Sequence, residues 1–118
     1  MAVTDYARPG QGAPIDLGQL DVSASCNTAA TTTARMDITG YAIGGVRVPN
    51  GSSITSITWY AAANTSDTAV ALKDEDGVAV TQTVAADEYH ALPSALAGCK
   101  LVLPVTDAAG TLQFHWER

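Results

Sequence analysis

Short β-favouring segments alternate with turn-forming residues along most of the chain, and this alternation limits the fold more than any other feature. About eight segments, rich in Val, Ile, Leu, Thr and aromatic residues, are separated by turn residues at intervals of roughly 8 to 12 residues. That spacing is typical of a β-sandwich or a β-barrel. Alanine runs such as residues 61–63 are too short for a useful helix. The sequence therefore predicts an all-β protein with a single antiparallel β-sandwich over residues 15–118.

An acidic turn lies beyond the middle of the chain. Two apolar runs, residues 69–72 and 78–84, flank the sequence DEDG at 74–77. An Asp-Gly pair between such runs predicts the tip of a β-hairpin, because glycine tolerates the positive φ angle that tight turns require. Clustered carboxylates also suit calcium, but the spacing of a calcium-binding loop is absent. We therefore expect a solvated turn and no metal site.

The clearest period-two pattern lies between residues 36 and 48. Apolar side chains occupy even-numbered positions, and polar ones such as Arg47 fall on the other face. The pattern predicts strands with one buried face, formed by Met36, Ile38, Val46 and Val48. The glycine pair at 44–45 predicts either a division into two strands or a bulge.

The strand pattern is weak at the start of the predicted sandwich and strong at its end. Residues 15–22 predict a first strand with an irregularity, followed by a polar loop over residues 23–33. Residues 111–116 alternate clearly and predict a last strand, with Trp116 on its apolar face. Trp59 shares the apolar phase of its own segment, so we expect both tryptophans to be core residues.

Residues 1–14 differ from the rest of the chain. They contain two prolines and two glycines and have almost no apolar periodicity. They therefore predict an extended N-terminal arm rather than part of the core. Tyr6 and Arg8 are its largest side chains. Such an arm is either an unattached terminus or a segment that binds a partner, and the sequence leaves both open.

The charge of the chain excludes one class of partner. Six basic and twelve acidic residues give a net charge of −6, and Lys and Arg form no cluster. Nucleic-acid binding normally needs a basic surface, so we expect no nucleic-acid partner. No stretch approaches the roughly 18 apolar residues of a membrane span, and the N-terminus lacks the apolar region of a signal peptide. We therefore expect synthesis in the cytoplasm and no association with a membrane.

Catalytic signatures are absent from the sequence. His90 and His115 are the two histidines, and neither accompanies a nucleophile motif or a glycine-rich phosphate loop. Cys26 lies in a Ser/Thr-rich segment and Cys99 at the start of an expected apolar strand. Two free thiols are the favoured interpretation, and a disulfide between them is the alternative. We predict no enzyme, no catalytic residues and no cofactor.

Tyr60 and Tyr89 are candidate surface aromatics. Unlike the two tryptophans, they do not share the apolar phase of their neighbours. Exposed aromatic rings on a β-sandwich can stack on sugar rings, so both tyrosines are possible surface contacts.

From Gly45 onward the chain resembles small virion proteins of tailed bacteriophages. An apolar strand ending in Pro precedes an aromatic-bearing strand, an acidic Asp-Gly hairpin, a Leu-Pro link and a further apolar strand. The segments that carry the likeness are GVRVP at 45–49, ITWYAA at 57–62, ALKDEDGVAV at 71–80, YHALPSALAG at 89–98 and the strand 99–105.

The resemblance implies a jelly-roll-like sandwich that decorates or caps a phage particle, on the capsid or as a base for a head spike or tail fibre. A decoration or cement protein is favoured, because no large distal domain follows Arg118. The implied partners are the major capsid protein and further copies of the chain, with a trimer favoured, and the implied location is the virion surface. The hypothetical contact residues are Tyr6, Arg8 and Pro9. The alternative is a carbohydrate-binding or fibre-base module that uses Tyr60 or Tyr89.

Overall fold

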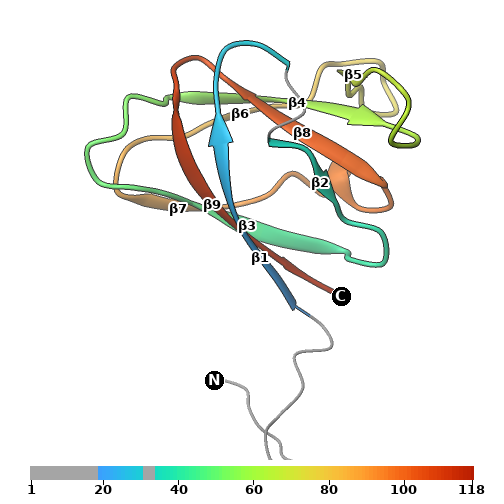
Figure 1. Ribbon diagram of the computed structural model, residues 1–118, viewed down its shortest axis with the longest axis horizontal. Coiled ribbons are helices and arrows are strands. Elements are labelled where there is room, and N and C mark those ends of the chain that lie inside the picture. Colours follow the sequence, from blue (N-terminus) through green and yellow to red (C-terminus); the bar gives the residue numbers. More distant parts are fainter. Residues whose placement is uncertain (1–18, 31–33) are drawn as a thin grey trace, which may run out of the picture.

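Two antiparallel β-sheets pack face to face in the computed structural model, which describes residues 19–30 and 34–118 (Figure 1). The first sheet has the order β1-β9-β3-β7. Its strands are β1 (Gln19–Cys26), β9 (Gly110–Glu117), β3 (Ile43–Val48) and β7 (Glu88–Ala91). In the second sheet β8 lies between β2 and β4, and β5 and β6 both pair with β4. Its strands are β2 (Met36–Asp37), β8 (Leu101–Thr106), β4 (Ser56–Ala62), β5 (Val70–Ala71) and β6 (Thr81–Thr83).

The strand order is that of a jelly roll. β5 pairs with Tyr60 and Ala61, and β6 continues in the same direction along residues 56–58 of β4, so together they form one interrupted edge strand. Counted this way, the described residues supply eight strand positions, ordered 1-8-3-6 in one sheet and 2-7-4-5 in the other. Double-sheet jelly rolls have this eight-strand arrangement. The predicted all-β, jelly-roll-like sandwich is confirmed.

Three aromatic rings join the two sheets. Trp59 of β4 meets Phe114 and Trp116 of β9 edge to face, with ring centroids 5.6 and 6.3 Å apart. All three side chains are buried, as the sequence pattern predicted for both tryptophans. Edge-to-face contact suits the quadrupoles of the rings, and rings of this size contribute much of a core's buried apolar area. The remaining core is mostly Val, Ile and Leu.

The first strand extends further than the sequence predicted. β1 runs to Cys26, so residues 23–26 belong to a strand and not to the predicted loop. Ala24 and Cys26 are buried while Ser23 and Ser25 are exposed, which continues the alternation. This alternation was not recognised in the sequence, because a segment of small and polar residues is also typical of a loop. The expected start at residue 15 lies outside the described residues.

The period-two segment divides between the two sheets, but not at the glycine pair. β2 ends at Asp37, and Gly40, with a positive φ of 86°, lies in the turn that follows, while Gly44 and Gly45 lie inside β3. Met36 and Val46 both point into the core, from opposite sheets. The alternation was therefore interpreted correctly, but the glycine pair marks neither a break nor a bulge, because residues 43–47 pair with β9 in continuous register.

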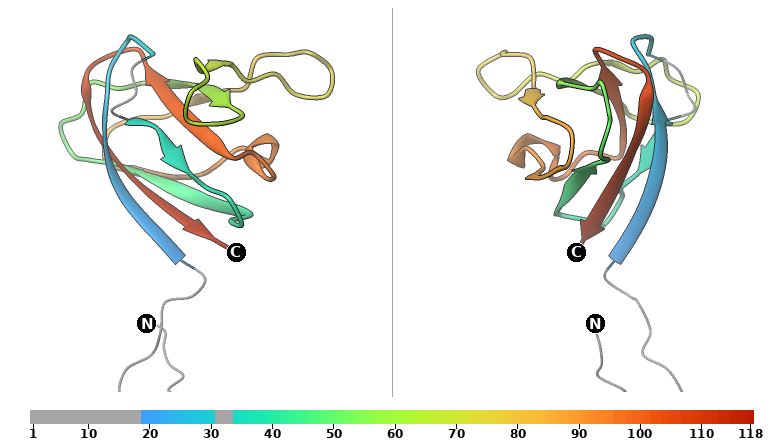
Figure 2. Two further views of the ribbon diagram at one scale, coloured as in Figure 1. Left: turned by 45° about the vertical axis from the view of Figure 1, so that its right-hand side comes forward. Right: turned by 90° about the vertical axis from the view of Figure 1, so that its left-hand side faces the viewer.

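The acidic turn forms a hairpin that protrudes from the interrupted edge strand. Both ends of the hairpin over residues 72–80 are hydrogen-bonded to Trp59 of β4. Leu72 N donates to Trp59 O, and Trp59 N donates to Val80 O. Asp74 Oδ1 accepts bonds of 2.9 Å from the amides of Asp76 and Val78, and Gly77 has a φ of 78°. The predicted tip is confirmed. Figure 2 shows the loop projecting beyond the sandwich.

Strand β8 begins later than the sequence predicted. A single 3₁₀ turn, Ser94–Leu96, follows Pro93, and Gly98 then adopts a φ of 86°. The strand begins only at Leu101, so Cys99 precedes it. Because a positive φ cannot continue a strand, Gly98 separates the turn from β8.

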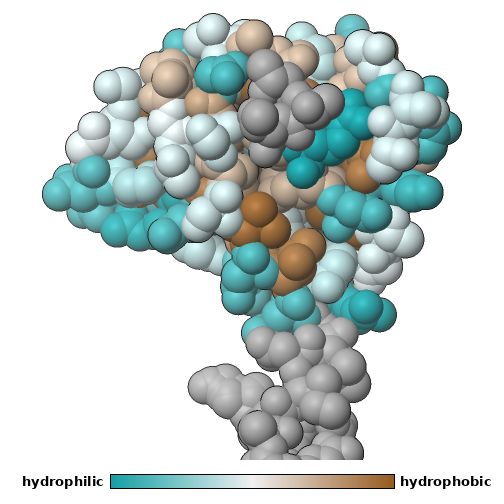
Figure 3. All heavy atoms as spheres, in the orientation of Figure 1, coloured by the Kyte–Doolittle hydropathy of each residue, from teal (hydrophilic) through white to brown (hydrophobic). Residues whose placement is uncertain are grey.

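Apolar surface on the face shown in Figure 3 is limited to small patches between hydrophilic side chains. Across the described part of the chain, no helix is long and apolar enough to cross a membrane. The predicted arm, residues 1–14, lies outside the described residues.

Candidate functional site

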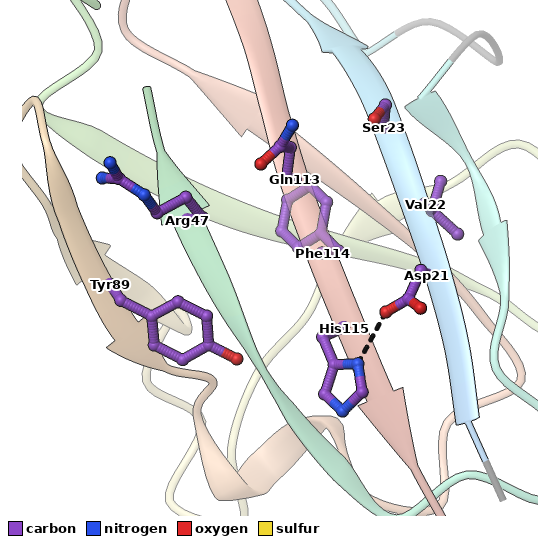
Figure 4. A pocket seen from close by; sticks show the side chains of 8 residues that line it. All are labelled: Asp21, Val22, Ser23, Arg47, Tyr89, Gln113, Phe114 and His115. Atoms are coloured by element: carbon purple, nitrogen blue, oxygen red, sulfur yellow. Dashed lines mark hydrogen bonds and ion pairs between the residues drawn. The ribbon is translucent and has the colours of Figure 1, made fainter. Parts of the chain in front are cut away.

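A groove of about 330 Å³ lies on the outer face of the first sheet. Alternation along each strand directs side chains outward from all four strands. Their register places Asp21 opposite His115, and aligns Ser23, Gln113, Arg47 and Tyr89 in one row across β1, β9, β3 and β7. Figure 4 shows these side chains on the face of the sheet, with Phe114 among the lining residues. The sandwich itself therefore positions the site.

Tyr89 forms one side of this groove. The residue is 61% exposed, although it belongs to a strand. A Cβ atom on Gly45 would lie only 2.3 to 2.5 Å from the Tyr89 ring and hydroxyl. The ring therefore lies directly against the backbone of β3, in space that any other residue would fill. In Figure 4 its hydroxyl points across β3 toward His115.

Arg47 is held beside the tyrosine by two hydrogen bonds. Its Nη1 donates to the carbonyl oxygen of Val48 at 2.8 Å, and its Nη2 donates to Asp87 Oδ1 at 2.7 Å. Asp87 has a φ of 62°, which is unusual for a residue other than glycine. Because the guanidinium carries five N–H groups, it retains donors for a further partner.

His115 lies between two carboxylates. Its Nδ1 is 2.6 Å from Asp21 Oδ1, and its Nε2 is 2.9 Å from Glu117 Oε2. Hydrogen bonds to Asp21 first and to Glu117 second raise the pKa of His115 above its ordinary value. The protonated ring can donate to both partners, so it links β9 to β1 and orients the Asp21 carboxylate toward the groove.

The two candidate tyrosines differ in their surroundings. Tyr60 is half-buried and packs against the core cluster, on the sheet that lacks this groove. Tyr89 is exposed and lies in the groove. The structure therefore separates them, and of these two tyrosines Tyr89 is the one with an open aromatic surface. Tyr6, Arg8 and Pro9 fall outside the described residues.

A second hollow of about 430 Å³ lies between the acidic hairpin and the 3₁₀ turn. Asp74, Glu75 and Asp76 line it with Lys73, but the Asp74 carboxylate already caps the turn. No group of three or more His, Cys, Asp or Glu side chains able to hold a metal ion occurs among the described residues.

The cysteines are separate free thiols. Burial raises the pKa of Cys26 to about 11 and also raises that of Cys99. Both thiols therefore stay protonated at neutral pH, which makes them poor nucleophiles. The favoured interpretation of the sequence, two unbonded thiols, agrees with the structure.

Sequence reasoning identified Tyr89 but missed its neighbours in the groove. Asp21, Arg47 and Gln113 received no functional interpretation, because nothing local distinguishes them from ordinary outward-facing residues. Asp21 and His115 are 94 residues apart in the chain. Only the strand order brings them together.

The fold and the groove define the class: a jelly-roll β-sandwich with a small, mixed polar and aromatic groove on one sheet face. No protein-family model, curated protein or solved structure matches the chain.

Proposed function

We propose that the chain is a structural protein of a tailed-bacteriophage particle that binds the capsid surface and stabilises or decorates the shell. The observation that carries this proposal is the jelly-roll strand order, an architecture from which viral capsid and lectin domains are built. The resemblance inferred from the sequence motifs of residues 45–105 leads to the same proposal. Its action is binding, not catalysis, and it needs no cofactor.

The surface of the sandwich suits protein contact. Val70 on the edge strand is 65% exposed, and Val78 near the hairpin tip is 58% exposed. Charged residues make up only 15% of the chain. Apolar side chains beside an unpaired strand edge give a protein partner both apolar area and backbone hydrogen bonds.

Weak contacts of this kind suffice on a particle. Copies that bind several capsid sites or one another act at a high effective concentration, so modest individual affinities add up to stable attachment. A trimer over a capsomer junction, with residues Tyr6, Arg8 and Pro9 contacting the major capsid protein or an adjacent copy, fits this arrangement. The mature location would be the virion surface.

Co-sedimentation with capsids that lack the protein tests the proposal. The expected result is saturation at a fixed ratio to the major capsid protein that matches the number of capsomer junctions. Binding at a few copies per particle would contradict shell decoration and favour a vertex or tail position, and no binding would overturn the proposal. Sedimentation equilibrium of the purified chain measures the oligomer, for which a trimer is expected.

A further inference from the structure

We infer that the groove on the outer face of the first sheet is a binding site for a neutral saccharide, with the Tyr89 ring as its stacking surface. This inference rests on the groove alone and does not depend on a role in the virion. The sequence suggested carbohydrate binding as an alternative function and named Tyr60 and Tyr89, but it did not locate a binding site. The structure assigns one of them to a groove.

The Tyr89 ring packs against the backbone of β3. Its hydroxyl, Cε1 and Cζ lie against Gly45, where a Cβ atom would come within 2.3 to 2.5 Å of them. The residue nevertheless keeps 61% of its surface exposed. A ring held in its binding position loses little conformational entropy when a ligand arrives, which favours affinity. The C–H groups on one face of a pyranose ring are the apolar partner that such a surface accepts.

Polar side chains surround the tyrosine at the edge of the groove. Arg47 has N–H groups beyond those bound to Val48 and Asp87, and Gln113 carries both a donor and an acceptor. Asp21 can accept further bonds, because its carboxylate has more lone pairs than the contact with His115 uses. Planar groups with paired donors or paired acceptors can bind two neighbouring hydroxyls of a sugar. Figure 4 shows Arg47, Gln113 and Asp21 on the same face of the sheet as Tyr89.

The charges in and around the groove favour a neutral ligand. Arg47 is paired with Asp87, and His115 lies between Asp21 and Glu117, so carboxylates outnumber basic groups locally. The chain as a whole carries −6. An anionic sugar, a phosphate or a nucleotide would meet repulsion there. A volume of about 330 Å³ lies at the small end of ligand pockets and suits one or two sugar units.

An NMR titration of the isotope-labelled full chain tests this site. The probes are methyl β-glucoside, methyl β-galactoside, methyl β-N-acetylglucosaminide and the matching β-linked disaccharides. For at least one probe we expect saturable shifts of the amides of Gly45, Tyr89, Gln113 and His115, together with upfield shifts of the sugar ring protons. Absence of saturable shifts with every probe would overturn the inference.

Four variants separate stacking from other effects. Tyr89→Ala and Gly45→Ala should each weaken binding at least tenfold, the second by displacing the ring while leaving its chemistry intact. Tyr89→Phe keeps the ring and should stay within about threefold of the native chain. Tyr60→Ala, on the other sheet, is the matched control and should bind normally. The dispersion of each variant's spectrum shows that it is folded.

The same variants distinguish the sugar site from a protein contact. Co-sedimentation with capsids should not change in Tyr89→Ala if the groove serves a saccharide. Saturable sugar binding that persists in Tyr89→Ala would place the sugar elsewhere and overturn the inference. Loss of capsid binding in that variant, with no sugar shifts in the native chain, would identify the groove as a protein contact and leave the proposed virion function standing.

Discussion

At the residue scale, Trp59 is the side chain whose loss should matter most for stability. It is fully buried and contacts Phe114 and Trp116 across the two sheets. Trp59→Ala should lower the free energy of unfolding by about 3–5 kcal/mol, from lost contacts and the cavity left behind. Urea denaturation measures this. Tyr89→Ala, in a residue that is largely exposed, is the control and should destabilise the protein clearly less than Trp59→Ala. An equal loss in both variants would contradict the assignment of the core.

The buried indole of Trp59 allows a second comparison. Its Nε1 has no hydrogen-bond partner among the described residues. Trp59→Phe therefore removes an unsatisfied donor while keeping a ring against Phe114. It should destabilise the protein clearly less than Trp59→Ala does in the same urea experiment. Equal destabilisation would mean that the ring contacts contribute little.

His115 should make stability depend on pH. Asp21 and Glu117 raise its folded-state pKa above the unfolded value of 6.5. A raised pKa means that the folded state holds the proton more tightly. The stabilisation is therefore complete below pH 6.5 and is lost as pH rises through the folded-state pKa. NMR titration of the His115 ring should show this raised value, and Asp21→Asn should lower it. An unchanged value in Asp21→Asn would contradict the pairing.

At the element scale, the protruding hairpin depends on the backbone angle of Gly77. The φ of 78° is unfavourable for other residues, and no atom lies within 4 Å of a Cβ built there. Gly77→Ala should therefore cost about 1–2 kcal/mol through backbone strain alone. Gly77→Asn should cost less, because asparagine adopts left-handed conformations more readily. Thermal unfolding compares the two, and a larger loss in the asparagine variant would contradict this explanation.

The turn between β8 and β9 is joined to the start of β4 by one carboxylate. Asp107 accepts bonds from the amides of Thr55 at 2.8 Å and Ser56 at 3.1 Å, and from the Thr55 hydroxyl. These bonds, with the Thr55 hydroxyl first, lower the pKa of Asp107 below 3.8. Stability from this group is present above pH 3.8 and is lost as pH falls through the folded-state pKa.

Removal of that carboxylate should be visible locally. In Asp107→Ala, the amides of Thr55 and Ser56 should exchange with solvent faster than in the native chain, as hydrogen exchange at neutral pH measures. The amides of β1, which Asp107 does not contact, serve as the internal reference. Unchanged exchange at both positions would contradict protection of these amides by the Asp107 carboxylate.

Strands with strong apolar alternation could be predicted from the sequence, but which strands they pair with could not. The last strand was predicted because Leu112, Phe114 and Trp116 alternate with polar residues. The end of β1 was missed because Ala24 and Cys26 are too small to mark a buried face. Pairing is non-local: β9 lies between β1 and β3, although it is the last strand of the described chain. The groove depends on that pairing, so only Tyr89 could be anticipated.

At the scale of the whole molecule, the sandwich and the N-terminal segment should be separable. Every core residue and every strand described lies between Gln19 and Arg118. Deletion of residues 1–14 should therefore leave the thermal melt of the sandwich nearly unchanged. Under the proposed virion function, the same deletion should abolish co-sedimentation with capsids, because it removes Tyr6, Arg8 and Pro9.

Two further variants show which surface is responsible for any loss of capsid binding in that deletion. Tyr6→Ala with Arg8→Ala keeps the length of the segment and should weaken capsid binding if those side chains make the contact. Val70→Asp places a charge on the exposed edge strand and tests whether the sandwich itself also contacts the shell. Capsid binding that survives the deletion but is lost in Val70→Asp would transfer the contact from the arm to the strand edge. Binding unaffected by either change would exclude both surfaces as the attachment site.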